Sequence, residues 1–199
     1  INNDEANLTY IRSFLTENGI VYTEPEVGIF SMAGGNGQPI QVRYGSAEAL
    51  KIGYKRFGYT GVTMDHCYRI TIEEEKKGIR VIWWKSFELE PRYGLSSVRK
   101  CNVVKSYILA ACGKVKTKIY ARETEIREIT NAQARPFLDA NSFYGYRSAS
   151  LTYGLFNTKP AGDIPPGTLI MVLSIGHPYY GKNLYDLEVL RSSTLLNVQ

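Results

Sequence analysis

The sequence predicts an α/β protein made of two small modules. Over the first half of the chain, stretches whose apolar residues recur at helical spacing alternate with short apolar runs of strand length. The character changes after Gly113, where a basic stretch with period-two alternation begins. Because 199 residues are enough for two small domains, we expect a small mixed-sheet module over residues 1–113 and a second, α+β module over residues 114–199.

The first module is expected to open with a helix over residues 4–18. Its apolar residues recur at helical spacing, and Gly19 supplies a stop. Three short strands follow, and the Gly-rich stretch 34–37 is a turn signal between the last two. The expected spans of these strands are 20–22, 27–32 and 40–44. Residues 47–54 are expected to continue the sheet and residues 55–63 to form a loop.

A helix, a buried strand and a second helix come next. Residues 65–77 are expected to be helical up to Gly78, with two lysines at the negative end of the helix dipole. Residues 79–84 form a continuous apolar-rich run, which is typical of a strand buried on both faces. A further helix is expected over residues 96–111. This order of elements is what predicts the α/β class.

The second module is expected to be richer in strands. Lys114–Arg127 alternates basic and apolar side chains and predicts one long strand. Residues 131–140 are expected to be helical, with Pro136 inside the helix. Two further strands are expected at 150–156 and 168–174.

The charge of the chain favours an anionic partner. The formal net charge is +5 and the isoelectric point is about 9.0, so nucleic acid is the first candidate. Tyrosine is abundant, with 15 residues against 7 Phe and 2 Trp. Because tyrosine joins an apolar ring to a polar tip, two explanations stay open: half-wet surfaces that stack on a ligand, and a β-rich core.

Cysteine spacing and hydropathy exclude two classes of protein. Cys67, Cys101 and Cys112 have no Cys-x-x-Cys spacing and cannot pair fully, so we expect buried thiols in a reducing compartment rather than a zinc site or a disulfide framework. No apolar run approaches 18 residues, so no membrane-spanning helix is expected.

Several acidic residues are candidate metal ligands. A metal-dependent nuclease needs two or three carboxylates on one divalent ion, often with a His or Lys that handles protons. Asp65 and His66 form the most suggestive pair, because they lie where a loop enters a helix. The competing interpretation is that Asp65 simply caps this helix. The other candidates are Glu5, Glu24, Glu26, Glu88 and Glu90.

Basic residues predict contacts with phosphates. Eight basic residues face only two acidic ones between positions 99 and 127. Lysines at alternate positions of the expected strand would project to one face and track a phosphate backbone, although an edge strand protected by lysines explains the pattern equally well. Another cluster interleaves charge with aromatic rings, which suits phosphate contact and base stacking. The nucleic-acid-binding candidates are Lys55, Arg56, Tyr59, Arg99, Lys100, Lys114, Lys116, Lys118 and Arg122.

Several passages resemble one family. Residues 71–90 (TIEEEKKGIRVIWWKSFELE) and 107–127 (YILAACGKVKTKIYARETEIR) resemble consecutive segments of phage homing endonucleases of the Vsr-like (very-short-patch-repair-like) type. The similarity continues through FLDANSFYG, SLTYGLF, LIMVLSIGHPYYGKN and YDLEVLRSSTLLNV. It covers about the last two-thirds of the chain, whereas the first third matches only in the order of its elements.

The resemblance implies a Vsr/restriction-endonuclease-like first module and an acyltransferase-like accessory module after it. In that nuclease fold the active site is formed by four residues: an acid on the first helix, an Asp on a central strand, a His and a later Asp. By position, Glu5 matches the first-helix acid, His66 the histidine, and Glu88 or Glu90 the last acid. The candidate catalytic residues are therefore Glu5, Asp65, His66 and Glu88, with Glu5 and Asp65 as ligands of Mg²⁺.

The sequence departs from the family at the central strand. No acid stands near Gln41–Tyr44, where the strand Asp is expected, or near Gly53, where a second strand acid is expected. Loss of the central ligand should remove most of the activity, because the bound ion positions water and neutralises the phosphate. Either the centre is rebuilt from Glu24, Glu26 and Asp65, or the module is kept as a scaffold that binds DNA or protein.

Three functions remain open at this stage. The first is Mg²⁺-dependent cleavage or nicking of double-stranded DNA, and the second is a catalytically degenerate relative that binds DNA or a phage or host protein complex. The third is an acyltransferase-like enzyme in the second module, whose pyrophosphate-binding turn would lie beyond Gln199. The resemblance implies the cytoplasm of an infected bacterial host, with no membrane partner.

Overall fold

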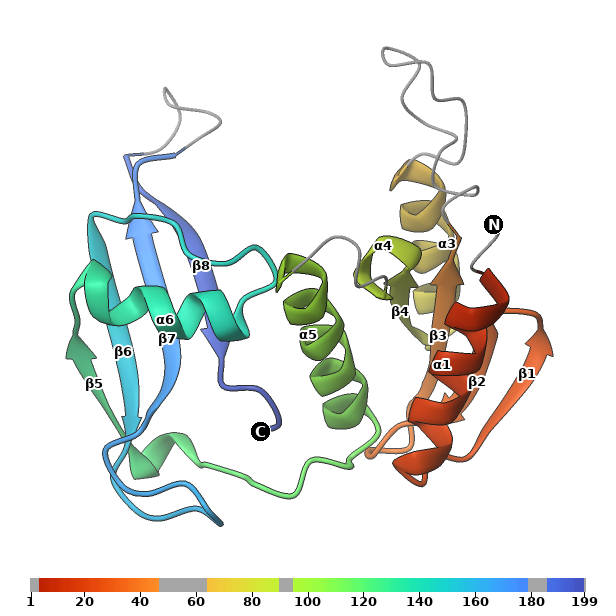
Figure 1. The fold of residues 1–199 in the computed structure, drawn as a ribbon, viewed down its shortest axis with the longest axis horizontal. Coiled ribbons are helices and arrows are strands. Elements are labelled where there is room, and N and C mark those ends of the chain that lie inside the picture. The colour runs from red at the N-terminus through yellow and green to blue at the C-terminus, as the bar shows by residue number, and fades with distance from the viewer. Residues whose placement is uncertain (1–3, 47–63, 90–94, 179–185, 199) are drawn as a thin grey trace. The chain divides into compact units, whose positions relative to one another are not determined.

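The computed structural model describes residues 4–46, 64–89, 95–178 and 186–198, with the side chains of 64–66 and 95–97 outside the description. The chain divides into two compact units, Ile1–Lys114 and Val115–Gln199. Each unit contains a four-stranded sheet with helices (Figure 1). The expected mixed α/β class is therefore confirmed. Within the described ranges no helix is long and apolar enough to cross a membrane.

The sheet of the N-terminal unit has the order β1-β2-β3-β4. Its strands are β1 (Tyr22–Glu26), β2 (Ile29–Ala33), β3 (Pro39–Gly45) and β4 (Arg80–Lys85). The first three strands pair antiparallel, but β3 and β4 pair parallel, which requires a crossover between them. Helix α3 (Met64–Lys76) lies in that crossover and joins β4 through a short link at Gly78. Helix α3 therefore begins at the edge of the sheet where β3 and β4 end (Figure 1).

Helices α1 (Asp4–Glu17) and α3 cover opposite faces of this sheet. The indole of Trp84 on β4 is fully buried and lies edge-on to Phe14 of α1, with ring centroids 5.4 Å apart. The neighbouring Trp83 points to the other face, where its Nε1 donates a hydrogen bond to Thr71 of α3 over 3.0 Å. Helices thus enclose β4 on both faces, as its continuous apolar run predicts.

Helix α5 (Leu95–Ala111) follows the short helix α4 (Ser86–Leu89) and ends against the β2–β3 turn. The backbone N–H of Gly35 donates to the carbonyl of Ala111 over 2.9 Å. A Cβ on Gly35 would lie 2.7 Å from the Cα of Gly113, which itself has a φ of 67°. The backbone of the β2–β3 turn therefore packs directly against the end of α5, and only a glycine at position 35 allows this approach. The sequence indicated this turn only as a hairpin signal.

The sheet of the C-terminal unit is antiparallel throughout, in the order β5-β6-β7-β8. Its strands are β5 (Thr124–Glu128), β6 (Leu151–Asn157), β7 (Leu169–Gly176) and β8 (Glu188–Thr194). Helix α6 (Asn131–Asn141) packs on one face of the sheet (Figure 1). The core beneath this helix consists of Ile129, Ala134, Phe137, Leu138 and Val172.

The helices expected from the sequence are confirmed to within about two residues, as are the strands expected at 27–32, 40–44, 79–84, 150–156 and 168–174. The strand expected at 20–22 is wrong, because β1 begins only at Tyr22 and runs to Glu26. The long strand expected over Lys114–Arg127 is wrong, because only Thr124–Glu128 pairs with a neighbour. Residues 114–120 form only one bridge, between Thr117 and Val198, and a 3₁₀ turn follows. Strand β8 was not expected, since its burial follows no simple alternation. The expectations for residues 47–54 and 55–63 lie outside the described residues.

Gly35→Ala is expected to lower the free energy of unfolding by about 2 kcal/mol, because the added methyl group meets the backbone of Gly113. Urea denaturation of the variant and the wild type measures the difference. Gly37→Asn is the matched control, since Gly37 lies in the same turn with a φ of 82° and nothing within 4 Å of an added Cβ. Equal losses in the two variants would show that the close approach is not the cause.

Candidate nucleic-acid interface

The elements that carry the sequence candidates meet at the edge of the sheet where β3 and β4 end. Asp4 in the first turn of α1 accepts a hydrogen bond of 2.7 Å from the hydroxyl of Tyr44, near the end of β3. Asn7 donates to the same hydroxyl over 2.9 Å. Helix α4 follows β4 directly, and α3 begins at this edge (Figure 1). We call this region, formed by the first turns of α1 and α3 and by residues 85–89, the carboxyl edge.

Glu88 is the most deeply buried acid among the described side chains of the carboxyl edge. It is 2% exposed, and its Oε2 accepts the backbone N–H of Lys85 over 2.9 Å. Burial raises the pKa of Glu88, while the Lys85 N–H and the charges of Lys85 and Lys100 oppose the shift. The bond has the geometry of half a capping box, in which a glutamate reaches back to the N–H that precedes its helix. Glu88 therefore stabilises the start of α4 and is also a carboxyl group suited to proton transfer.

Two lysines lie close to an exposed aromatic ring next to Glu88. Phe87 is 36% exposed. The Nζ of Lys85 lies 5.8 Å from the centroid of its ring, and the Nζ of Lys100 on α5 lies 5.5 Å from it. Phosphate contact by the lysines and stacking on the ring are the two interactions by which proteins bind nucleic acid without reading its sequence.

Lysine and arginine side chains also lie over tyrosine rings elsewhere in the protein. No tyrosine is fully buried among the described residues, but Tyr146 packs against the core of the C-terminal unit and Tyr22 lies edge-on to the buried Phe30, so both explanations of the tyrosine content stay open. In the N-terminal unit Lys105 lies over the ring of Tyr10 and Arg80 over that of Tyr107. In the C-terminal unit Arg122 lies 5.1 Å from the ring centroid of Tyr120. These pairs place charge beside aromatic surface, as half-wet stacking surfaces require.

Glu5 and Glu24 share one arginine. Arg12 donates from Nη1 to Glu5 over 3.0 Å, and from Nε and Nη2 to the two carboxylate oxygens of Glu24 over 3.0 and 3.1 Å. Glu24 also accepts the backbone N–H of Gly28 over 3.0 Å. The bond from Arg12 lowers the pKa of Glu24. Arg12 thus occupies both carboxylate oxygens of Glu24, which serves a structural role, but only one oxygen of the exposed Glu5.

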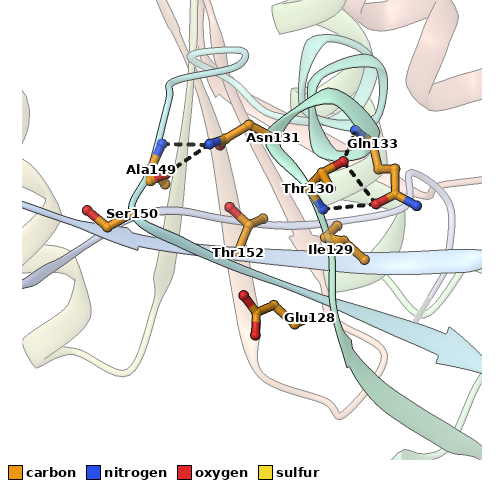
Figure 2. Close-up of a pocket in the computed structure, with 8 residues that line it drawn as sticks. All are labelled: Glu128, Ile129, Thr130, Asn131, Gln133, Ala149, Ser150 and Thr152. Atoms are coloured by element: carbon orange, nitrogen blue, oxygen red, sulfur yellow. Dashed lines mark hydrogen bonds between the residues drawn. The ribbon is translucent and has the colours of Figure 1, made fainter.

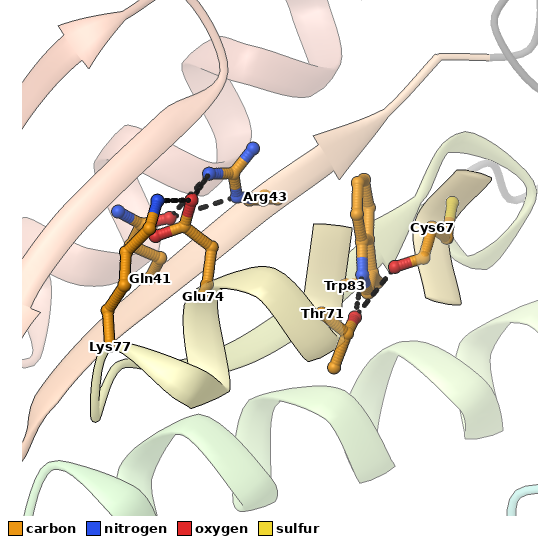
Figure 3. A network of polar contacts seen from close by, with 7 residues as sticks. All are labelled: Gln41, Arg43, Cys67, Thr71, Glu74, Lys77 and Trp83. Carbon is orange, nitrogen blue, oxygen red and sulfur yellow. Dashed lines mark hydrogen bonds and ion pairs between the residues drawn. The ribbon is translucent and has the colours of Figure 1, made fainter. Parts of the chain in front are cut away.

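The strand where the resemblance expects an aspartate contains an arginine network instead (Figure 3). Arg43 on β3 donates to Gln41 from Nε and Nη2, over 2.9 and 2.7 Å. Its Nη2 also lies 3.6 Å from Glu74 of α3, which accepts from Lys77 over 3.0 Å. The polar face of β3 therefore fastens α3 to the sheet, and it offers no carboxylate of its own to a metal ion.

The remaining candidates divide into those that the structure describes and those that it does not. Asp65 and His66 lie in the first turn of α3, but their side chains are outside the description. The residues outside the description altogether are Lys55, Arg56, Tyr59 and Glu90. Among the described residues no group of three His, Cys, Asp or Glu side chains could hold a metal ion. The expected Mg²⁺ site on Glu5 and Asp65 stays a prediction.

The described basic candidates differ in exposure. Arg99 and Lys100 are partly exposed on α5, near the carboxyl edge. Lys114, Lys116 and Lys118 are exposed, but they stand on an irregular segment, so the argument from a strand face is wrong for them. Arg122 is exposed beside its tyrosine. Lys100 is the candidate that the structure places against Phe87.

The three cysteines are buried and free of disulfide bonds, as expected. Burial raises the pKa of each thiol, so all three stay protonated at neutral pH. The thiol of Cys101 lies 3.6 Å from the hydroxyl of Tyr10 and joins α5 to α1.

Sequence reasoning missed Lys85 and Phe87, although a signal was available. A basic residue directly after a buried apolar strand, followed by an aromatic one, marks the point where the chain leaves the core for the surface. Side chains at the carboxyl ends of parallel strands commonly form the binding sites of open α/β sheets.

Comparison with models of known protein families, with curated proteins and with solved structures finds no match. Function is therefore inferred from the geometry of the carboxyl edge.

Glu88→Gln is expected to change how stability depends on pH. The pKa of Glu88 is raised above its ordinary value of 4.5, so the folded protein binds this proton more tightly than the unfolded chain does. The resulting contribution to the free energy of unfolding is fully present below pH 4.5 and is lost as pH rises through the raised pKa. The variant should therefore gain stability relative to the wild type between acid and neutral pH. Denaturation at a series of pH values measures this, and parallel curves would show that burial does not perturb the carboxyl group.

Glu24→Gln is expected to show the opposite sign. The pKa of Glu24 is lowered from its ordinary value of 4.5. The contribution of the ionised carboxylate to the free energy of unfolding is therefore present above pH 4.5 and is lost as pH falls through the lowered pKa. The variant should be less stable than the wild type by about 1 kcal/mol at neutral pH, with the difference vanishing in acid. A difference that persists in acid would assign the loss to packing rather than to the ion pair with Arg12.

Proposed function

We propose that the N-terminal unit binds double-stranded DNA through the carboxyl edge and the adjoining start of α5. The observation that carries the proposal is the pair of lysines, Lys85 and Lys100, close to the exposed Phe87 ring. The two ammonium groups contact phosphates, and the ring packs against sugar or base. The excess of positive charge over the whole chain, +5, supports an anionic partner.

The proposal extends to the fold of each unit. In this proposal the N-terminal unit is a Vsr-like homing-endonuclease module, which is supported by its first helix and by a parallel strand pair whose ends carry candidate residues. The C-terminal unit is an acyltransferase-like accessory module with one helix on an antiparallel sheet. In this proposal the protein acts in the cytoplasm of an infected bacterial host, where a phage or host protein complex is a further partner.

Binding without cleavage is the function that the described carboxylates favour. Among the described residues no group of three His, Cys, Asp or Glu side chains could hold a metal ion, and Glu5 and Glu88 bond Arg12 and the backbone N–H of Lys85. The described residues thus do not fit a Mg²⁺ site. Metal-dependent cleavage is the second candidate, because Asp65 and His66 stand in the first turn of α3, where that helix meets the carboxyl edge.

Replacing Lys85 and Lys100 by glutamine tests the interface. Each lost phosphate contact should reduce the slope of log affinity against log salt by about 1, and the double variant should bind a duplex about tenfold more weakly. Fluorescence anisotropy with a labelled duplex at several salt concentrations gives both values. Lys76→Gln is the matched control, an exposed lysine in the last turn of α3, at the other end of the sheet. An equal effect of Lys76→Gln would show only a loss of overall charge.

A plasmid nicking assay with Mg²⁺ or Mn²⁺ separates binding from cleavage. We expect salt-sensitive binding with no nicking, because the described carboxylates are already engaged. Nicking by the wild type that is lost in both Asp65→Asn and His66→Ala, with duplex binding intact, would contradict this and establish the second candidate.

A further inference from the structure

The C-terminal unit contains a pocket of about 500 Å³ beside the first turn of α6 (Figure 2). The end of β5, the start of α6 and the segment that enters β6 form its walls. Six of its lining residues are polar: Glu128, Thr130, Asn131, Gln133, Ser150 and Thr152. Its volume lies in the range of small-molecule sites.

Hydrogen bonds hold two walls of the pocket in place. The side chain of Thr130 accepts the backbone N–H of Gln133, and the side chain of Gln133 accepts the backbone N–H of Thr130 over 2.9 Å. Asn131 bonds the backbone of Ala149 through both ends of its amide, over 2.9 and 3.2 Å. The polar side chains of Thr130 and Asn131 are thereby used within the protein, and the walls are formed before any ligand arrives.

The hydroxyl of Thr152, at the pocket wall, has no hydrogen-bond partner among the described residues. Thr152 lines the pocket, is 3% exposed, and donates no side-chain hydrogen bond to any described residue. Figure 2 shows it between Asn131 and Glu128. Ser174 lies directly opposite Thr152 in the β6–β7 pairing, is 0% exposed, and has a buried hydroxyl without a partner. The Ser174 hydroxyl is enclosed by the protein and does not line the pocket, whereas the Thr152 side chain forms part of the pocket wall, where its hydroxyl can bond a ligand.

The remaining polar groups of the pocket both donate and accept. Glu128 offers a carboxylate, Ser150 a hydroxyl and Gln133 the N–H groups of its amide, while the first N–H groups of α6 have no partner within the helix. No lysine or arginine lines the pocket, so a phosphate would face the charge of Glu128 without a cation. No aromatic ring lines it either, so a nucleobase would find no stacking surface.

We propose that this pocket binds a neutral sugar. Adjacent sugar hydroxyls each donate and accept one hydrogen bond, which matches a lining of one carboxylate, hydroxyls and an amide. Thr152 takes the most deeply inserted sugar hydroxyl, and Glu128 accepts from a pair of hydroxyls at the pocket mouth. The site is independent of the DNA-binding proposal, since all its residues belong to the C-terminal unit.

Titration of the full chain with glucose, ribose and galactose, followed by amide NMR, tests the site. At least one of these sugars should shift the signals of residues 128–133 and 149–152. Thr152→Val keeps the shape of the side chain and removes the hydroxyl, so it should weaken binding at least tenfold while leaving the melting temperature unchanged or higher. Thr194→Val, at an exposed position on β8, is the matched control and should leave the affinity unchanged.

Glu128→Gln supplies a second variant at an exposed side chain, where a folding defect is not expected, and it should also weaken sugar binding. The proposal is overturned if no sugar shifts these signals, or if glucose 6-phosphate or glycine shifts them and the neutral sugars do not. A fall in melting temperature in Thr152→Val, with sugar affinity retained, would assign the Thr152 hydroxyl to the fold and also overturn the proposal.

Discussion

The indole ring of Trp84 lies fully buried at the end of β4, edge-on to Phe14 and with its centroid 6.2 Å from that of Tyr10. Burial of so large a ring contributes several kcal/mol and fixes the end of the strand against α1. The chain can leave the core only after this anchor, so Lys85, Phe87 and Glu88 follow at the carboxyl edge. The candidate interface is therefore a consequence of where β4 ends.

Charged groups near the carboxyl edge have roles set by their surroundings. Glu24 lies against a guanidinium and its pKa is lowered, whereas Glu88 is buried and its pKa is raised. Arg43 is tied to Gln41 and Glu74, and so it holds α3 on the sheet. Lys85 and Lys100 lie beside the exposed ring of Phe87, where the proposed phosphate contacts are placed. The sequence alone could not show which candidate acids are paired with a cation and which are buried.

Local signals in the sequence predicted the helices well, because their stripes and glycine stops depend on neighbouring residues. Pairing partners lie far apart in the sequence, so the alternation of Lys114–Arg127 was mistaken for a long strand and β8 was not expected. Lys100 and Glu88 were among the predicted site residues, but the ring beside the lysines was not. The pocket beside α6 had no sequence signal, since its lining residues come from β5, the start of α6 and β6 and meet only in the folded unit.

Hydrogen–deuterium exchange of the full chain, with and without a saturating DNA duplex, tests the DNA-binding interface most directly. The account predicts that the duplex slows amide exchange over residues 85–89 and over the first half of α5, while the strands of the C-terminal unit are unchanged. Slowed exchange confined to residues 115–198, with the carboxyl edge unaffected, would contradict it.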